Sequence, residues 1–390
     1  MSHYNKKIKI LHLVENLDDS YGGPAKSIPN LAASISDHFD QTLISLEFKD
    51  EESNEVIAEQ NLDWKVFKIS FLEKFRISIS LFFYLLRKRK NYDILHAHNL
   101  WNFIPIVTTI IGKLTNKKIV FSPRGSLYSW SLNQNRIVKL IAWNLYQKRI
   151  LNLADCIHVT EKEELKQLKA LGIKSPISLI PNGISLSEFT FTEKEFAKKF
   201  LELDLNKKYI LFLSRIHKKK GVTNLIKAIH QIKEDFTSYK LLIIGPGIES
   251  EYGRNALKLI HNLDLEEIIT IKDMVTGSKR KAYFQAADFF ILPSYTENFG
   301  IVIAEALANK LPVITTKGTP WEEIEIHNAG WWLDNNSAEL IAQTLRKALS
   351  MTSQEVELMG NKAISIARGY DWEKLSSKYV KMYNGITDHN

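Results

Sequence analysis

The sequence is poor in cysteine and lacks long apolar runs. Its 390 residues include one cysteine, Cys156, so no internal disulfide can form and nothing indicates an oxidising compartment. The first residues show no hydrophobic region of the kind that a signal peptide requires. The longest apolar run, 77–86, is about half the length that spans a bilayer. These absences predict a cytoplasmic protein with a buried structural thiol.

Extremes of composition are also absent. Hydrophobic residues make up 45% of the chain and charged residues 25%, which are values of a folded globular protein. A single hydrophobic core stops growing near ~250–300 residues, so a chain of 390 favours two domains. We find no internal repeat and no low-complexity tract.

Acidic residues are scarce in part of the first half. The net charge of the chain is +8, and residues 65–149 hold 16 basic residues against two acidic ones, Glu73 and Asp93. Such a field attracts nucleic acid, acidic lipid head groups or a diphosphate-bearing acceptor. Nucleic acid is disfavoured, because long apolar runs interrupt the basic stretch and no aromatic–basic platform is present.

One part of this basic region has the pattern of an interfacial helix. Residues 75–86 are largely apolar and 87–90 read Arg-Lys-Arg-Lys. A helix there is too short to span a membrane but could lie on an anionic membrane surface with its cations at phosphate level. The alternative is that the apolar run packs on a sheet and only the cations are exposed.

Strand and helix patterns alternate along both halves of the chain. This alternation predicts βαβ units with parallel sheets. The expected strands are 9–14, 92–98 and 118–122 in the first half, then 209–213, 240–244, 289–292 and 312–315 in the second. The turn Pro181-Asn182-Gly183 precedes a polar stretch and marks the expected domain boundary. Two doubly wound sheets in tandem imply a ligand-binding cleft between domains.

The most informative segment is 293–306, PSYTENFGIVIAEA, where a strand ends and a helix is expected to start near Phe299. Glu297 and Glu305 are eight residues apart, a little over two helical turns, so both carboxylates could line one side of a cleft. Ionised carboxylates accept hydrogen bonds from sugar diols. The amides of Asn298, Phe299 and Gly300 would open the helix and favour an anion.

Two further segments suit phosphate binding. Arg215 and Lys220 flank a tight loop after a strand, where two cations could hold a diphosphate. Gly22 and Gly23 follow the first strand, and glycines let the backbone approach a phosphate closely. This glycine pair is equally consistent with a plain turn, because it does not form a Gly-x-Gly-x-x-Gly pattern.

Together these segments resemble glycosyltransferase family 4, a retaining family of GT-B fold. The resemblance rests on the Glu-x7-Glu run at 297–305, on Ser214-Arg215 with Lys220-Gly221, on Pro181 to Ile184, and on Tyr370-Asp371-Trp372. It implies an α/β fold of two Rossmann-like, doubly wound parallel-sheet domains facing across a cleft. Residues 1–184 would bind the acceptor, 185–372 the nucleotide-sugar donor, and 373–390 would form a helix crossing back to the first domain.

The resemblance also implies roles for the motif residues. Arg215 and Lys220 would neutralise the donor diphosphate, and Gly22 and Gly23 would approach it from the other domain. Glu297 would contact the donor sugar and act with the two cations in catalysis, and Glu305 would hold the ribose diol. Asn298, Phe299 and Gly300 complete the expected donor site.

The chain departs from the family pattern at Arg124, which stands where many members carry histidine. An arginine cannot act as a base at neutral pH, but it could bind an acceptor phosphate. His98 follows a strand pattern and is a second acceptor-side candidate, and His96 fits a core histidine better. No acidic cluster resembles a divalent-metal site, so we expect no required metal and no cofactor besides the nucleotide-sugar co-substrate.

The sequence therefore predicts a retaining hexosyltransferase that uses a nucleotide-sugar donor. The expected acceptor is a glycan, in particular a lipid-linked intermediate of capsule, O-antigen or exopolysaccharide (lipopolysaccharide-type) synthesis. The protein would be cytoplasmic, or peripheral on the inner face of the cell membrane. The alternatives are a nucleotide-sugar epimerase or sugar phosphorylase of the same fold, and a non-catalytic nucleotide-sugar-binding protein. Use of free phosphate, or product formed without an acceptor, would identify the enzymatic alternatives.

Overall fold

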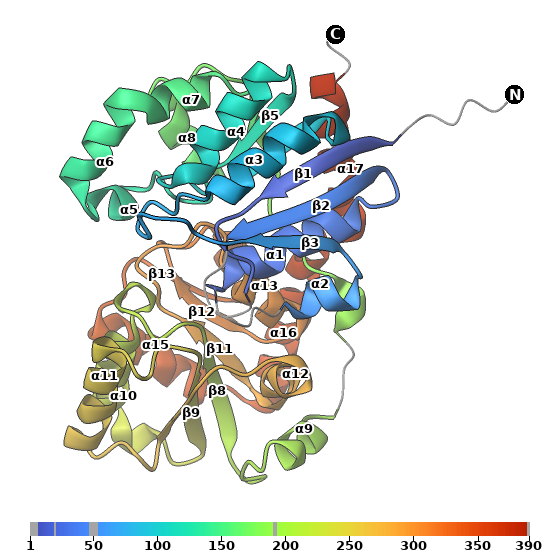
Figure 1. The fold of residues 1–390 in the computed structure, drawn as a ribbon. Coiled ribbons are helices and arrows are strands. Elements are labelled where there is room, and N and C mark those ends of the chain that lie inside the picture. The colour runs from blue at the N-terminus through green and yellow to red at the C-terminus, as the bar shows by residue number, and fades with distance from the viewer. Residues whose placement is uncertain (1–6, 19–20, 47–53, 190–192, 388–390) are drawn as a thin grey trace, which may run out of the picture. The chain divides into compact units, whose positions relative to one another are not determined.

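The computed structural model describes residues 7–18, 21–46, 54–189 and 193–387 (Figure 1). Contacts divide the chain into two compact units. Unit 1 comprises Met1–Gly183 together with Trp372–Asn390, and unit 2 comprises Ile184–Asp371. The chain thus passes from unit 1 to unit 2 after Gly183 and returns to unit 1 after Asp371. Both units are α/β, and every strand pair in their sheets is parallel.

Unit 1 contains a seven-stranded sheet in the order β3-β2-β1-β4-β5-β6-β7. The strands are β1 (Ile8–Leu13), β2 (Phe39–Leu46), β3 (Asp63–Phe67), β4 (Ile94–His98), β5 (Lys118–Ser122), β6 (Cys156–Val159) and β7 (Ile177–Leu179). The helices are α1 (Gly23–Ser34), α2 (Glu55–Glu59), α3 (Ile79–Lys88), α4 (Phe103–Leu114), α5 (Ser129–Asn133), α6 (Arg136–Ala142), α7 (Lys148–Asn152), α8 (Lys162–Ala170) and α17 (Trp372–Thr387). The order reverses between β1 and β4, which is where open parallel sheets bind ligands.

Unit 2 contains a six-stranded sheet in the order β10-β9-β8-β11-β12-β13. The strands are β8 (Lys208–Leu213), β9 (Tyr239–Ile244), β10 (Ile269–Lys272), β11 (Phe289–Leu292), β12 (Val313–Thr316) and β13 (Gly330–Leu333). The helices are α9 (Lys194–Phe200), α10 (Val222–Gln231), α11 (Glu251–Asn262), α12 (Gly277–Ala286), α13 (Ile301–Ala308), α14 (Glu323–Ile326), α15 (Ala338–Leu349) and α16 (Ser353–Ala367). Here the order reverses between β8 and β11.

The C-terminal helix α17, red in Figure 1, packs on the sheet of unit 1. Its buried residues are spaced to form one face, namely Trp372, Leu375, Tyr379, Met382 and Tyr383. They share a core with Ile10 and Phe39 of the sheet. The last three residues of the helix predicted over 373–390 lie outside the described residues. Cys156 is buried in the same core, and burial raises the pKa of its thiol to about 11, which suits a structural thiol.

Helix α3 lies within residues 75–90, the segment that the sequence predicted either to lie on a membrane surface or to pack on a sheet. Its Leu81 and Leu85 are buried in the core of unit 1, whereas Ile79 and Phe83 are almost half exposed. The apolar run therefore packs mainly on the sheet, as the second interpretation has it. Among the described residues, no helix has both the length and the apolar character needed to cross a membrane.

Candidate active site

In unit 2, two loops carry the motif residues to the point where the strand order reverses. Arg215 and Lys220 follow β8, and Glu297 follows β11, the neighbour of β8 in the sheet. The backbone joins the two loops, since the amide of Tyr295 donates to the Lys219 carbonyl at 2.8 Å. Gly221 has a φ of +76°, and a Cβ there would lie 2.2 Å from the Pro293 carbonyl oxygen. Glycine at this position thus lets the two loops approach each other.

Lys220 and Glu297 form a buried ion pair between these loops. Lys220 Nζ lies 2.5 Å from Glu297 Oε1, and the two side chains are 11% and 9% exposed. Ser294 Oγ donates to the same carboxylate oxygen at 2.7 Å. Burial alone would raise the pKa of Glu297, but the charges of Lys220 and Lys219 and these hydrogen bonds outweigh it, so the pKa is lowered. Glu297 is therefore ionised at neutral pH.

Arg215 differs from Lys220 in its surroundings. Its side chain is exposed and makes no ion pair with any residue in the described part of the chain. An exposed guanidinium beside a buried Lys–Glu pair can bind an anionic group without breaking an internal contact.

Glu305 lies on α13 and is 1% exposed. Arg280 of α12 binds both of its oxygens, with Nη1 3.0 Å from Oε1 and Nη2 2.5 Å from Oε2. This bidentate contact fixes the orientation of the carboxylate. No sequence motif indicated Arg280, because the arginine lies 25 residues from its partner and outside every motif.

The start of α13 corrects two expectations. The helix begins at Ile301, not near Phe299, and Gly300 precedes it with a φ of +74°. Glu297 therefore lies outside the helix, and the argument that helical spacing aligns Glu297 with Glu305 is wrong. The amides of Asn298, Phe299 and Gly300 belong to the loop before the helix. Trp321, near this loop, packs in the core and donates from Nε1 to the Phe299 carbonyl at 2.6 Å.

In unit 1, the glycine pair begins α1 directly beside the reversal of strand order. Gly22 is the N-cap of α1 with a φ of +95°, a conformation that favours glycine, and Gly23 is the first helical residue. The first turn has no acidic residue and no side-chain cap. The helix N-terminus is therefore compatible with an anion, as the sequence suggested.

Arg124 and His98 are in direct contact in unit 1. Arg124 Nε donates to His98 Nδ1 at 3.1 Å, and Nη1 contacts Ser27 Oγ at 3.0 Å and Asn182 Oδ1 at 3.4 Å. All three partners are neutral. The remaining nitrogen, Nη2, is buried and has no hydrogen-bond partner among the described residues. Burial lowers the pKa of Arg124, but a guanidinium remains charged at neutral pH.

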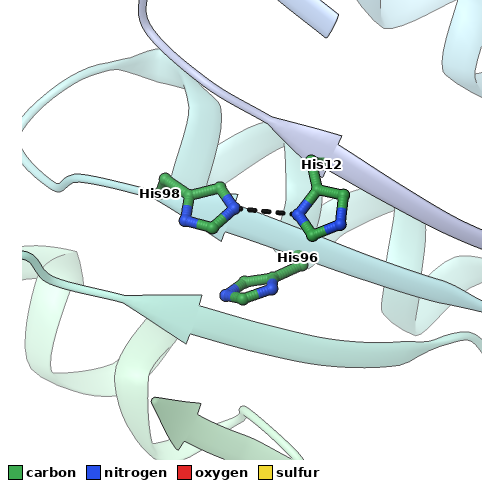
Figure 2. A group of neighbouring side chains, drawn as sticks. All are labelled: His12, His96 and His98. Atoms are coloured by element: carbon green, nitrogen blue, oxygen red, sulfur yellow. Dashed lines mark hydrogen bonds between the residues drawn. The ribbon is translucent and has the colours of Figure 1, made fainter. Parts of the chain in front are cut away.

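His98 is the last residue of β4, where the expected strand 92–98 also ends, and it is fully buried with His12 and His96 (Figure 2). His12 Nδ1 lies 3.0 Å from His98 Nε2, the dashed contact in Figure 2. Among the described residues, these three rings are the one group of His, Cys, Asp and Glu side chains close enough to hold a metal ion. However, both nitrogens of each ring already have a protein partner within 3.1 Å. The residues present therefore fit a hydrogen-bond network better than a metal site.

Two family models match the chain. Residues 21–188 match Glycosyltransferase Family 4, and residues 193–365 match Glycosyl transferases group 1. The two matches follow each other along the chain and together cover most of it. They also correspond to the main parts of units 1 and 2.

Individual relatives agree with these matches. D-inositol 3-phosphate glycosyltransferase of Pseudarthrobacter chlorophenolicus is 24% identical over 318 residues, 77% of this chain and 72% of that protein. WcaL of Escherichia coli strain K12, a glycosyltransferase named for colanic acid biosynthesis, is 30% identical over 155 residues, 38% of this chain and 37% of that protein. The crystal structure of HepE from Anabaena with UDP and glucose gives a TM-score of 0.81 at 17% identity, covering 97% of this chain and 100% of HepE. The chain is therefore a glycosyltransferase that belongs to family 4 and has the GT-B fold.

Proposed function

We propose that the protein is a retaining hexosyltransferase that moves a sugar from a nucleotide-diphosphate-sugar donor to a glycan acceptor. The observation that carries the proposal is the buried Lys220–Glu297 pair beside exposed Arg215, at the strand reversal of unit 2. The two cations suit the diphosphate of such a donor, and the carboxylate suits the hydroxyls of its sugar. HepE, which has the same fold, binds UDP and glucose.

Each donor-site residue has a role that fits its surroundings. Arg215 and Lys220 bind the diphosphate, and Glu297, oriented by Lys220 and Ser294, accepts hydrogen bonds from the donor sugar. Glu305, fixed by Arg280, accepts the ribose hydroxyls. In unit 2 the loop 298–300 contributes its backbone to the donor site. In unit 1 the start of α1 at Gly22 and Gly23 is a helix N-terminus suited to a phosphate.

The proposed chemistry needs electrostatic stabilisation more than a base. In front-face retention the acceptor hydroxyl attacks from the side that the nucleotide leaves, and the departing phosphate takes the hydroxyl proton. Negative charge then accumulates on the diphosphate, where preorganised cations lower the barrier. Arg215 and Lys220 supply this charge, and we propose that no metal is required.

On the acceptor side we propose that Arg124 binds a phosphate. Its Nη2 has a hydrogen atom to donate and no described partner, and its other contacts are neutral. A related glycosyltransferase is named for a phosphorylated compound, D-inositol 3-phosphate. A lipid-linked sugar diphosphate of capsule, O-antigen or exopolysaccharide synthesis offers the same group, and WcaL is named for one such polysaccharide.

A lipid-linked acceptor places the protein on the cytoplasmic face of a membrane, and α6 provides a suitable surface. Five large apolar side chains on α6 and the helical turn after it are more than half exposed: Ile137, Val138, Leu140, Ile141 and Leu145. We call this set the α6 apolar face. Arg136, Lys148 and Arg149 flank it and are exposed, and residues 94–154 contain no acidic residue. An amphipathic, basic helix of this kind binds anionic lipid.

The test is a screen for nucleotide release from a panel of UDP-, GDP- and ADP-sugars. We expect one donor to be hydrolysed slowly, faster once a polyprenyl-diphosphate sugar is added, and equally fast with EDTA. A donor that isomerises without any acceptor, or release that requires inorganic phosphate, would identify an epimerase or a phosphorylase. Binding of a donor without any turnover would identify a nucleotide-sugar-binding protein, and loss of activity with EDTA would contradict metal independence.

A further inference from the structure

Four histidines lie side by side in the sheet of unit 1, and the proposed transfer reaction assigns none of them a role. His12, His96, His98 and His158 come from β1, β4 and β6, and all four are fully buried. Burial, the largest cause in each case, lowers their imidazole pKa values, to about 4 for His12 and about 3 for His158. The rings are therefore neutral at pH 7, and each carries one N–H and one acceptor nitrogen.

The first hydrogen-bond chain starts at Arg124. A guanidinium can only donate, so His98 Nδ1 accepts from Arg124 Nε at 3.1 Å. The proton of neutral His98 is then on Nε2, which donates to His12 Nδ1 at 3.0 Å. His12 in turn carries its proton on Nε2 and donates to Gln41 Oε1 at 2.8 Å. The direction of every bond follows from the first one.

The second chain is fixed from its opposite end. The Ile180 carbonyl can only accept, so His158 Nε2 donates to it at 2.8 Å and His158 Nδ1 accepts from Ser122 Oγ at 2.7 Å. Ser122 Oγ then accepts from His96 Nε2 at 2.7 Å. The free lone pair of His96 is on Nδ1, which accepts from Tyr383 of α17 at 2.7 Å. Burial holds the pKa of Tyr383 well above its usual value, so the phenol keeps the proton it donates.

Each chain has one end at or near Arg124. The first begins at Arg124 itself, through its bond to His98. The second fixes the carbonyl of Ile180, two residues before Asn182, whose Oδ1 accepts from Arg124 Nη1. The arginine is thus held by Nε and Nη1, while Nη2 stays without a described partner. Its hydrogen-bond partners are all neutral, and the charge of Glu164 acts on the guanidinium without a hydrogen bond to it.

We propose that His98 and His12 are positioning residues that hold Arg124 in its anion-binding orientation through a one-way chain of neutral imidazoles. The proposal rests on the acceptor-binding role of Arg124 given above. A metal ion bound by the three histidines would have to break at least one of the two contacts that each ring makes, so the chain and a metal site exclude each other. The carboxylate that usually orients a metal-bound or catalytic histidine is replaced here by Gln41.

The first arm of the test reads the tautomers directly. In the full-length protein labelled with ¹⁵N-histidine, long-range ¹H–¹⁵N NMR at pH 7 should show Nε2–H tautomers for all four rings, with assignments from single variants. Metal analysis of the same sample should show no stoichiometric transition metal. An Nδ1–H tautomer at His98 or His12, an imidazolium, or a stoichiometric metal ion would overturn the chain.

The second arm uses two substitutions at one position. His98→Asn keeps an oxygen near the place of Nδ1 and can still accept from Arg124, whereas His98→Gln has its polar atoms near the place of Nε2. We expect His98→Gln to raise the acceptor KM about tenfold or more with little change in the donor KM, and His98→Asn to rescue most of this loss. His38→Asn, at an exposed position of unit 1, is the matched control.

A double-mutant cycle separates positioning from general damage. Because His98 is proposed to act through Arg124, His98→Gln should add little to the acceptor KM of Arg124→Lys. Equal losses in His98→Asn and His98→Gln, or additive losses with Arg124→Lys, would overturn the positioning role. Nε2–H tautomers together with an unchanged acceptor KM in Arg124→Lys would support the hydrogen-bond chain and reject the acceptor role of Arg124 in the proposed function.

Discussion

Lys220 Nζ and Glu297 Oε1 are 2.5 Å apart, in side chains that are about one-tenth exposed, and they join the loops after β8 and β11. The pair therefore has two functions that a variant would disturb together. It presents a cation to a bound anion, and it neutralises a buried carboxylate. Arg215, which is exposed, has only the first of these functions.

This contrast predicts different outcomes for the two cations. Arg215→Ala should lower turnover about 10²-fold or more without changing the thermal midpoint, because only a charge facing the diphosphate is lost. Lys220→Ala should lower turnover and also destabilise unit 2 by about 3–5 kcal/mol, because it leaves Glu297 buried without its partner. The measurements are steady-state kinetics and urea unfolding.

A double variant isolates the structural part of the Lys220 effect. Lys220→Met with Glu297→Gln should recover most of the lost stability and none of the activity. Wild-type turnover in Arg215→Ala, or in the double variant, would contradict the assignment of these residues to the diphosphate and donor sugar.

The two carboxylates should divide nucleotide and sugar binding between them. Glu305→Gln should weaken binding of the bare nucleoside diphosphate about tenfold, since a charge-assisted contact to a ribose hydroxyl is lost. Glu297→Gln should leave nucleotide affinity nearly unchanged and reduce kcat. Calorimetric titration of the nucleotide into both variants measures the two affinities. The same titration into Arg280→Lys shows how far nucleotide binding by Glu305 depends on its bidentate partner. Equal affinity losses in the two Glu variants would refute the division.

The buried histidines predict an acid-sensitive unit 1. An unfolded histidine has a pKa near ~6.5, whereas burial lowers the pKa to about 4 for His12 and about 3 for His158 in the folded protein. Below pH ~6.5 the unfolded chain gains protons that the folded chain does not, so stability is complete above this pH and is lost as the pH falls. Each such ring contributes up to about 1.4 kcal/mol per pH unit. Arg124, the charged group near all four rings, opposes their protonation further.

Urea unfolding at pH 7.5, 6.5, 5.5 and 5.0 checks this prediction. The free energy of unfolding should fall across the range, and less steeply in His158→Gln than in the wild type. Glu297 does not interfere, because its lowered pKa removes stability only when the pH falls below the usual carboxyl range. His38→Asn, which changes an exposed ring, should leave the slope unaltered. A stability that is constant from pH 7.5 to 5.0 would show that the four rings accept protons freely.

The α6 apolar face should bind anionic vesicles. Ile137→Ser with Leu145→Ser should reduce sedimentation with phosphatidylglycerol vesicles at low salt, because exposed apolar area is removed without loss of charge. Binding should also fall as salt increases. The matched control replaces Arg87, Lys88, Arg89 and Lys90 of the α3 region with Gln, and should have the smaller effect if α6 is the main contact. Protein that remains in the supernatant with vesicles would contradict membrane binding through this face. So would a dimer in the absence of lipid that is lost in Ile137→Ser with Leu145→Ser, because the face would then be a protein interface.

The sequence predicted the strands where apolar runs are bounded by polar residues or turns. Phe289–Leu292 and Lys118–Ser122 have the expected limits, and β1, β8 and β9 differ from expectation by one residue. Six strands were not predicted, namely β2, β3, β6, β7, β10 and β13. Of these, β13 (Gly330-Trp331-Trp332-Leu333) is only partly buried, so it shows neither alternation nor a continuous buried run. Short β7 was missed for a similar reason, as none of its three residues is buried.

For the site, sequence motifs could indicate residues whose partners lie in the same or the next motif. Lys220 and Glu297 are of this kind. Arg280 and the histidine network depend on contacts that only the folded sheet creates, such as the pairing of His12 with His96 across β1 and β4. The sequence does contain a signal for the histidine network, since polar residues recur inside otherwise apolar strands at His12, His96 and Ser122. The direction of the hydrogen-bond chain, from Arg124 to Gln41, follows only from interatomic distances.

The central claim is transfer of a sugar from a nucleotide-sugar donor with retention of anomeric configuration. The most direct measurement is ¹H NMR of the product formed from the preferred α-linked donor and a polyprenyl-diphosphate sugar acceptor. The account predicts an α-linked product in the wild type, in stoichiometric amount with released nucleotide, and no product above background in Arg215→Ala. A β-linked product, or nucleotide release without any glycosidic bond to the acceptor, would contradict it.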